Sequence, residues 1–192
     1  MNAYQRYHAL LETGESDVLP RLPILMAFAA KFIGANYAQF ASDYRVLVEA
    51  NLRCADYFGF DQVSAISDPY RETEGFGATI EYVEDGVPRC VAPPLANNPD
   101  MAGLKDADPL HSIRMLDRLN AIDACQNAVG GKYSILGWIE GPAAEAADLR
   151  GVSTFLMDLM MDPDYACRLM DRCVETGIAF ARATQRSINR QA

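Results

Sequence analysis

The chain has 192 residues, half of them hydrophobic, which is enough for one domain with a sizeable core. Its net charge of −9 and its lack of a long Lys and Arg run exclude the basic footprint of a nucleic-acid-binding protein and disfavour an anionic membrane surface. The sequence shows neither an apolar run of the roughly 18 to 20 residues that span a bilayer nor a signal peptide, so we expect a cytoplasmic protein.

The first third of the sequence predicts a helix, a strand and a longer helix. Apolar residues recur at helical spacing over residues 3–12, and Gly14 ends the pattern. The continuous apolar run Ile24–Phe28 predicts a strand that is buried on both faces. Apolar residues then return every three or four positions from Asn36 to Phe58, which predicts one long amphipathic helix.

A second buried strand, Val63–Ile66, is followed at once by polar and ionisable side chains. Two buried strands joined by a helix predict a parallel βαβ unit. Ligands bind at the carboxyl ends of such strands, so the residues that follow are candidates for a site. Asp68 is the first of them, although an Asp before a Pro also starts turns by binding nearby backbone N–H groups. The other candidates in this stretch are Tyr70, Glu72 and Glu74.

The middle of the chain predicts a β-hairpin and another helix. Side chains alternate on both sides of Asp85-Gly86, which is a strong hairpin signal and predicts an insertion after the second strand. A loop rich in Pro, Asn and Gly follows. Asp108 is a suitable N-cap and Pro109 a suitable first residue for a helix that ends at Gly130.

The last apolar strand, Tyr133–Trp138, also ends beside a carboxylate. Glu140 follows it directly, and the short predicted helix Ala143–Arg150 carries Glu145 and Asp148. A second acidic group at the end of a second strand favours a site, although Glu140 could instead pair with a neighbouring Arg. The methionine-rich helix Val152–Met161 and a helix from Asp164 to about Asn189 complete the chain.

These elements predict an α/β protein, and more narrowly a partial (β/α)8 TIM barrel with a β-hairpin insertion after the second strand. No linker or repeat divides residues 1–192, so we expect a single domain. A whole barrel usually needs about 250 residues. The sheet therefore needs partner strands or a cover, and a homodimer formed through the open edge is one solution.

The cysteine and histidine inventory does not predict a metal site within this chain. The five cysteines are scattered, no pair has C-x-x-C spacing, and His8 and His111 lie far apart in the sequence. The cysteines instead fit reduced, small core residues.

The order of these parts resembles the uroporphyrinogen decarboxylase superfamily, which includes zinc-dependent corrinoid and coenzyme M methyltransferases. The segments that carry the resemblance are RLPILMAFAAKFIG, FGFDQVSAISDP, GFGATIEYVEDGVP, ILGWIEGPAAEAADLRG and FLMDLMMDPDYACRLMD. The similarity runs over essentially the whole chain and corresponds to the N-terminal half, or somewhat more, of a barrel of about 340 residues.

For the decarboxylases, the resemblance implies residues that bind the carboxylate arms and pyrrole N–H groups of a tetrapyrrole. The family aspartate falls on Asp68. The two family arginines fall on Ala27 and Lys31, of which only Lys31 can bind a carboxylate, and as a point charge. The family tyrosine falls on or near Asp148, which would face a polyanionic substrate. These differences disfavour decarboxylation and porphyrin biosynthesis.

The methyltransferase branch implies a small methyl donor or acceptor, a corrinoid protein as partner, and carboxylates such as Glu140 and Glu145 after the last strand. Its zinc ligands are expected in a C-terminal half, so we expect no cofactor within this chain and zinc only where such a half supplies the ligands. Three hypotheses follow: a methyltransferase, a decarboxylase that uses Asp68, and a non-catalytic truncated chain or dimerising module.

Overall fold

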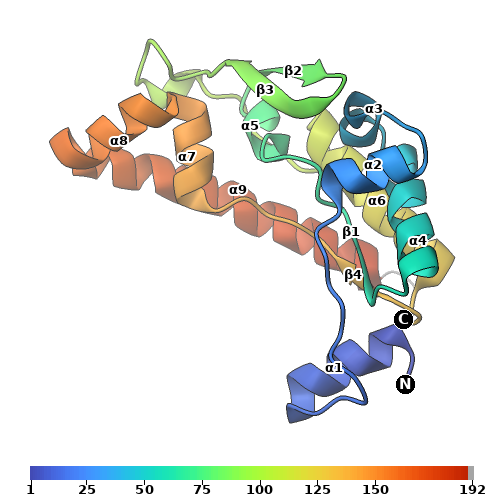
Figure 1. Cartoon of the computed structure of the whole chain (residues 1–192). Coiled ribbons are helices and arrows are strands. Elements are labelled where there is room, and N and C mark those ends of the chain that lie inside the picture. Colours follow the sequence, from blue (N-terminus) through green and yellow to red (C-terminus); the bar gives the residue numbers. More distant parts are fainter. Residues whose placement is uncertain (190–192) are drawn as a thin grey trace.

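The computed structural model describes residues 1–189 as a mixed α/β fold (Figure 1). Its helices and strands are listed here in chain order: α1 Ala3–Thr13, α2 Met26–Phe32, α3 Tyr37–Ser42, α4 Tyr44–Phe58, β1 Gln62–Ser64, α5 Arg71–Gly75, β2 Thr79–Val83, β3 Gly86–Ala92, the 3₁₀ turn Met101–Gly103, α6 Ile113–Val129, β4 Ser134–Leu136, α7 Pro142–Arg150, α8 Val152–Met161 and α9 Pro163–Asn189.

Strands β1 and β4 form a parallel pair, as expected for two of the parallel strands, but the βαβ unit predicted from Ile24–Phe28 and Val63–Ile66 is wrong, because the first of these segments is not a strand. Gln62 pairs with Ser134, and Ser64 pairs with Leu136. All three residues of β1 are buried. The crossover between the two strands contains α5, the hairpin and α6, and residues 1–189 contain no closed barrel.

The strand predicted over Ile24–Phe28 is wrong, because α2 begins at Met26. The preceding segment does run along β1: Asp61 N donates to Arg21 O at 2.9 Å, and Gln62 Nε2 donates to Pro23 O at 3.3 Å. It cannot continue as a full ladder strand because proline has no N–H to donate. Met26 takes a positive φ of 36° where the chain turns into the helix.

The single long helix predicted for Asn36–Phe58 is also wrong, because α3 and α4 meet at Asp43. Asp43 has extended backbone angles and caps α4, with its carboxylate accepting from Arg45 N at 2.9 Å. Asp is a preferred N-cap, so it can end one helix and start the next within an unbroken apolar pattern. Gly59, at a φ of 65°, ends α4 as expected.

The helix expected from Pro109 starts later, at Ile113. Asp108 accepts from Leu110 N at 2.8 Å and so stabilises a turn rather than the helix itself. The hairpin is confirmed: β2 and β3 pair antiparallel, with an irregular register on either side of Glu81.

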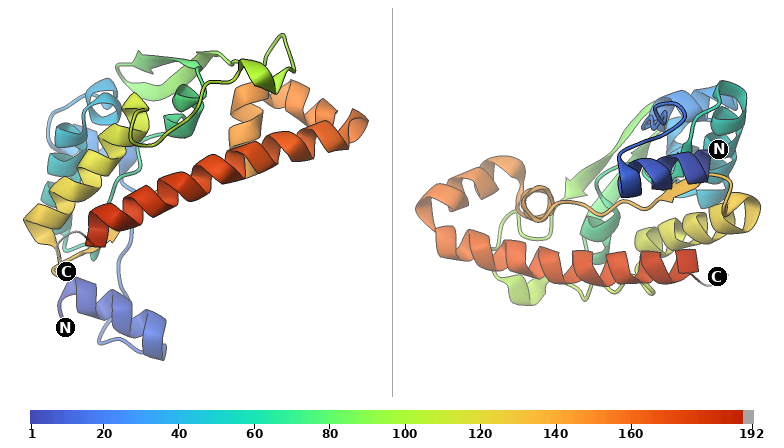
Figure 2. Two further views of the ribbon diagram at one scale, coloured as in Figure 1. Left: turned by 180° about the vertical axis from the view of Figure 1, so that it is seen from behind. Right: turned by 90° about the horizontal axis from the view of Figure 1, so that it is seen from below.

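Two apolar clusters hold the elements together. One lies among α2, α4, β1 and α6, and the other among α5, α6, α7 and α9. Helix α9 runs the length of the molecule beneath the strands and connects the α7 and α8 end with the α6 end (Figure 2). The apolar face of α8 is mostly exposed, and only its Phe155 is buried.

Helix α1 extends away from this body (Figure 1) and contributes no buried residue to it. Polar contacts tie it to the amino ends of the two parallel strands: Tyr4 N donates to Lys132 O, and Arg6 Nη1 lies 2.5 Å from Asp61 Oδ1. Among residues 1–189, no helix combines the length and apolar character that a membrane crossing requires.

Candidate functional site

The two parallel strands deliver their carboxyl ends to adjacent short segments. β1 leads into Ser67 and Asp68 and then α5, whereas β4 leads into residues 137–141, which we call the elbow, and then α7. Helices α5 and α7 contact each other between the hairpin and α9 (Figure 1). The acidic residues predicted from separate parts of the sequence are therefore brought into one region.

Asp68 is 2% exposed, and its carboxylate is already engaged within the protein. Oδ1 accepts from Tyr70 N at 3.0 Å, which is the turn interaction that an Asp before a Pro can make. Oδ2 accepts from the Ser67 hydroxyl at 2.5 Å and also from Arg114 Nη2. The geometry holds this side chain in a fixed position as an ion-paired carboxylate.

Arg71 links the ends of the two strands. It is fully buried, and its Nη1 donates to the backbone carbonyl of Asp68. Its Nη2 lies 3.5 Å from Glu140 Oε2, and its Nε lies 3.5 Å from Glu72 Oε2. Glu140 N in turn donates to Glu72 Oε1 at 3.0 Å, so the elbow is bound to α5 through both its backbone and its side chain.

Glu145 and Asp148 lie on α7 and face this network. Burial and the nearby Glu72 carboxylate raise the pKa of Glu145 well above its usual range. Burial, and then Glu140, raise the pKa of Asp148 to about 6. Burial also raises the pKa of Glu72, and the charge of Arg71 offsets this only in part. The region therefore holds more carboxyl groups than one guanidinium can neutralise.

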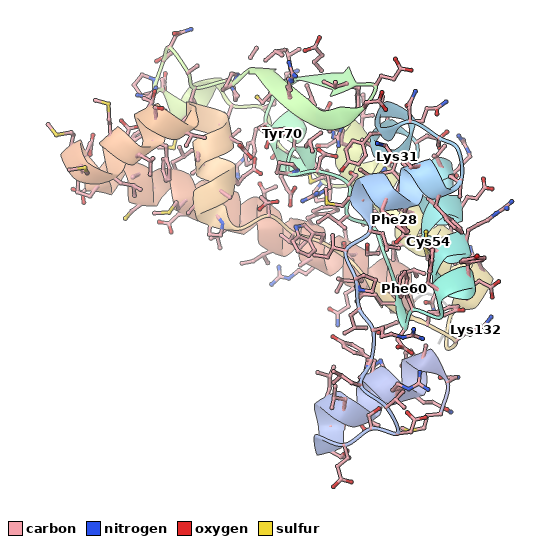
Figure 3. The ribbon with its side chains drawn as sticks, in the orientation of Figure 1. Phe28, Lys31, Cys54, Phe60, Tyr70 and Lys132 are labelled. Carbon is pink, nitrogen blue, oxygen red and sulfur yellow. The ribbon has the colours of Figure 1, made fainter. Side chains whose placement is uncertain are left out.

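Tyr70 and Cys90 border the same acidic region. Burial, followed by the charge of Asp148, raises the pKa of the Tyr70 phenol and of the Cys90 thiol. Figure 3 shows Tyr70 beside α5, under the hairpin. The two groups are thus held neutral next to a carboxylate that is mostly ionised at pH 7.

Lys31 and Glu74 are placed apart from this cluster. Lys31 is exposed on the last turn of α2 (Figure 3), and its ammonium forms no ion pair within residues 1–189. Glu74 points instead towards the start of α6, where Arg114 N donates to its Oε2 at 3.5 Å. The structure therefore gathers Asp68, Tyr70, Glu72, Glu140, Glu145 and Asp148, while Lys31 lies outside the group and Glu74 lies at its α6 side.

Sequence reasoning missed Arg114 and Arg118, both of which are buried on α6. Arg114 binds Asp68 and also contacts Tyr82, whose ring centroid lies 5.0 Å from the guanidinium carbon. Arg114 also lines a cavity of about 220 Å³ between α3, β2 and α6. The available signal was their spacing of four, which places them on one face of the helix with Leu119 and Ile122.

Residues 1–189 contain no group of three or more His, Cys, Asp or Glu side chains arranged to hold a metal ion. The donor set of this region therefore does not fit a zinc site. What it offers is a carboxylate that titrates near neutral pH, Asp148, and a rigid set of ion pairs behind it.

Comparisons with known proteins agree with this fold. A family model described as Uroporphyrinogen decarboxylase (URO-D) matches residues 3–187. Two sequences of the methylcobamide:CoM methyltransferase MtaA from Methanosarcina barkeri, one of them from strain Fusaro / DSM 804, are each 31% identical over 138 residues, or 70% of this chain and 40% of the relative.

A solved structure of a methyltransferase from Methanosarcina mazei matches with a TM-score of 0.86 at 22% sequence identity. The match covers 97% of this chain but 56% of that chain, and it shows a shared fold. The present chain thus spans between two fifths and three fifths of the length of these proteins.

Proposed function

Because the chain belongs to the uroporphyrinogen decarboxylase family, we propose that it supplies part of a (β/α)8 barrel that carries out corrinoid-dependent methyl transfer. The similarity to a methylcobamide:CoM methyltransferase supports the reaction class. Under this proposal, a corrinoid group or corrinoid protein is the methyl donor, and a small thiol is the acceptor.

The observation that carries this proposal is the acidic character of the site. The Asp148 side chain forms no ion pair or hydrogen bond within residues 1–189, and Glu140 shares Arg71 with Glu72. A tetrapyrrole with many carboxylates would be repelled by these charges, whereas a small neutral thiol brings no charge of its own into the site. Lys31, the cation expected at the position of a family arginine, lies elsewhere.

Asp148 has a chemical role in this proposal. A thiol must lose its proton before or during methyl transfer, because the thiolate is the nucleophile. A half-buried carboxyl with a pKa of about 6 is a suitable base at neutral pH. We assign no step to zinc, because the described residues do not fit its ligand set, and we propose that any zinc ligands lie outside them.

Methyl transfer is tested by mixing the whole barrel that contains this chain, with any zinc ligands it supplies, with methylcobalamin and a thiol, and following the loss of the methylcobalamin absorbance. We expect turnover in the wild type, and a loss of at least about tenfold for Asp148→Asn, which cannot act as a base. Glu12→Gln, an exposed change on α1, is the matched control. A folded protein that transfers no methyl group, or an Asp148→Asn variant as active as the control, contradicts the proposal.

Decarboxylation is the second candidate, because the family model carries that description and the sequence resemblance implies that Asp68 corresponds to the family aspartate. Its carboxylate already accepts from Ser67, Tyr70 N and Arg114, which leaves about one of its four lone-pair sites for a pyrrole N–H. The test is uroporphyrinogen turnover by the wild type and by Asp68→Ala. Turnover that does not change in the variant removes this candidate.

A further inference from the structure

The buried Glu145 side chain, where α7 faces α5, has both of its carboxyl oxygens without a hydrogen-bond partner among residues 1–189. The residue is 2% exposed. A carboxylate that is buried without donors costs several kcal/mol in most proteins, and such groups usually become neutral instead.

Among the groups that face Glu145 in residues 1–189, the one positive charge is that of Arg71. From α5 it meets Glu72, Thr73 and Arg71, and from its own helix it meets Asp148. The Cys90 thiol on β3 and the Cys173 thiol on α9 complete its surroundings, and both respond to its charge.

Arg71 is the one cation among these groups within the described residues, and it is already committed to other partners. Its guanidinium donates a hydrogen bond to the Asp68 carbonyl and forms ion pairs with Glu140 and Glu72. The described residues also offer no arrangement that would hold a metal ion in its place. Within residues 1–189, the way left to neutralise Glu145 is a proton.

A proton on Glu145 also satisfies its neighbour Glu72. Glu72 Oε2 is buried without a hydrogen-bond partner in residues 1–189, whereas the Thr73 hydroxyl lies beside Glu145 and can donate to it in either protonation state. A carboxylic acid has one O–H donor, whereas a carboxylate has none, so only the protonated form of Glu145 can donate to the Glu72 oxygen. The same protonation therefore removes a buried charge and fills an empty acceptor.

We propose that Glu145 is a neutral carboxylic acid in the folded protein at pH 7, and that it positions Glu72 and, through Glu72, the elbow residue Glu140. The link to the elbow is the hydrogen bond from Glu140 N to Glu72 Oε1 at 3.0 Å. Burial and the Glu72 charge, which raise the pKa of Glu145, support this assignment. The inference concerns the protonation of this chain and stands whichever reaction the site serves.

The first test compares urea unfolding of the 192-residue wild type with that of Glu145→Gln between pH 5 and pH 8.5. Glutamine keeps the shape, the neutrality and a donor, so we expect this variant to fold and to be at least as stable. In the wild type, protonated Glu145 stabilises the folded state, and this contribution is complete below the pKa of about 4.5 that the group has in the unfolded chain. It is lost as the pH rises through the raised pKa of the folded state. Over that range the folding equilibrium constant should fall by up to about tenfold per pH unit. Identical pH profiles for the two proteins would overturn the proposal, with Glu12→Gln as the control.

The second test measures the protonation of Glu145 directly in the wild type. The carboxyl carbon of Glu145 is followed by NMR through a pH titration of the wild type, using Glu145→Gln only to identify the signal. We expect it to remain protonated at pH 7. A carboxyl signal that has titrated by pH 7 overturns the inference.

The third test separates a positioning role from simple burial. In the wild type, the amide signal of Glu140 should titrate together with the carboxyl of Glu145, because Glu72 transmits the change. In Glu145→Gln that step should disappear, and only the step of the neighbouring Asp148, near pH 6, should remain. An amide that titrates equally in both proteins contradicts the positioning role.

Discussion

Arg71 Nη2 and Glu140 Oε2 lie 3.5 Å apart and join the ends of the two parallel strands, although 69 positions separate the residues in the sequence. Arg71 is fully buried, and its other nitrogens face the Asp68 carbonyl and Glu72. One guanidinium therefore determines how α5 sits against the elbow and α7.

The Arg71→Met variant should lose about 3 kcal/mol in the free energy of unfolding, because Glu72 and Glu140 would be left near each other without their shared cation. Urea denaturation at pH 7 measures this loss. Arg53→Met is the matched control, since its i,i+4 pair with Glu49 is exposed and should contribute under 1 kcal/mol. Equal losses in the two variants would contradict the role assigned to Arg71.

The ion pair of Asp68 with Arg114 should show strong coupling in a double-mutant cycle. We expect Asp68→Asn and Arg114→Met each to cost roughly 3 kcal/mol, because each leaves a buried charge unpaired. The double variant should cost about 2 kcal/mol less than the sum, which denaturation of all four proteins measures. Additive losses would show that the two side chains do not act on each other.

Asp148 should make the stability depend on pH near neutrality. Folding raises the pKa of Asp148 from 3.8 to about 6, so the folded protein favours the protonated form. The stability that this protonated carboxyl contributes is complete below pH 3.8 and is lost as the pH rises through 6. Because Asp148 is only half-buried, the effect should be modest: as the pH rises from 5 to 8, the free energy of unfolding of Asp148→Asn should increase by roughly 0.5 to 1 kcal/mol relative to that of the wild type. The check is the difference in unfolding free energy between the two proteins, and a difference that does not change with pH contradicts the assignment.

Gly137 should tolerate no side chain, because the elbow passes close to α9. A Cβ at this position would lie 2.5 Å from Thr184 Cγ2. Gly137→Ala should therefore cost about 1 to 3 kcal/mol by overpacking. Adding Thr184→Ser, which removes the methyl group in question, should restore most of that loss in thermal or urea unfolding. A double variant as unstable as Gly137→Ala would place the cost elsewhere.

Local patterns in the sequence were sufficient where one signal dominated. Gly14 and Gly59 end helices, Asp85-Gly86 turns the hairpin, and the apolar runs at β1 and β4 form parallel strands. Competing signals explain the errors. In Ile24–Phe28, proline upstream and helix-forming alanines downstream overcame the apolar run, and at Asp43 a capping side chain divided a continuous helical pattern.

The site could be predicted as a set of acidic residues but not as a network. Asp68 and Glu140 could be predicted as candidates from their positions after strands. The structure also shows the structural roles considered for them, since Asp68 accepts from a turn N–H and Glu140 pairs with an Arg. Arg114 and Arg118 escaped prediction because arginine on a helix usually faces water, and only the tertiary contacts show that these two are buried. Whether the acidic residues act on a substrate remains a prediction.

The attachment of α1 has a consequence for how the molecule opens. Since α1 has no fully buried residue and is attached by a few polar contacts, such as that of Arg6 with Asp61, its release should expose little apolar area and leave both cores intact. High salt should therefore release residues 1–19 before the rest of the chain unfolds, and limited proteolysis should cleave this segment first.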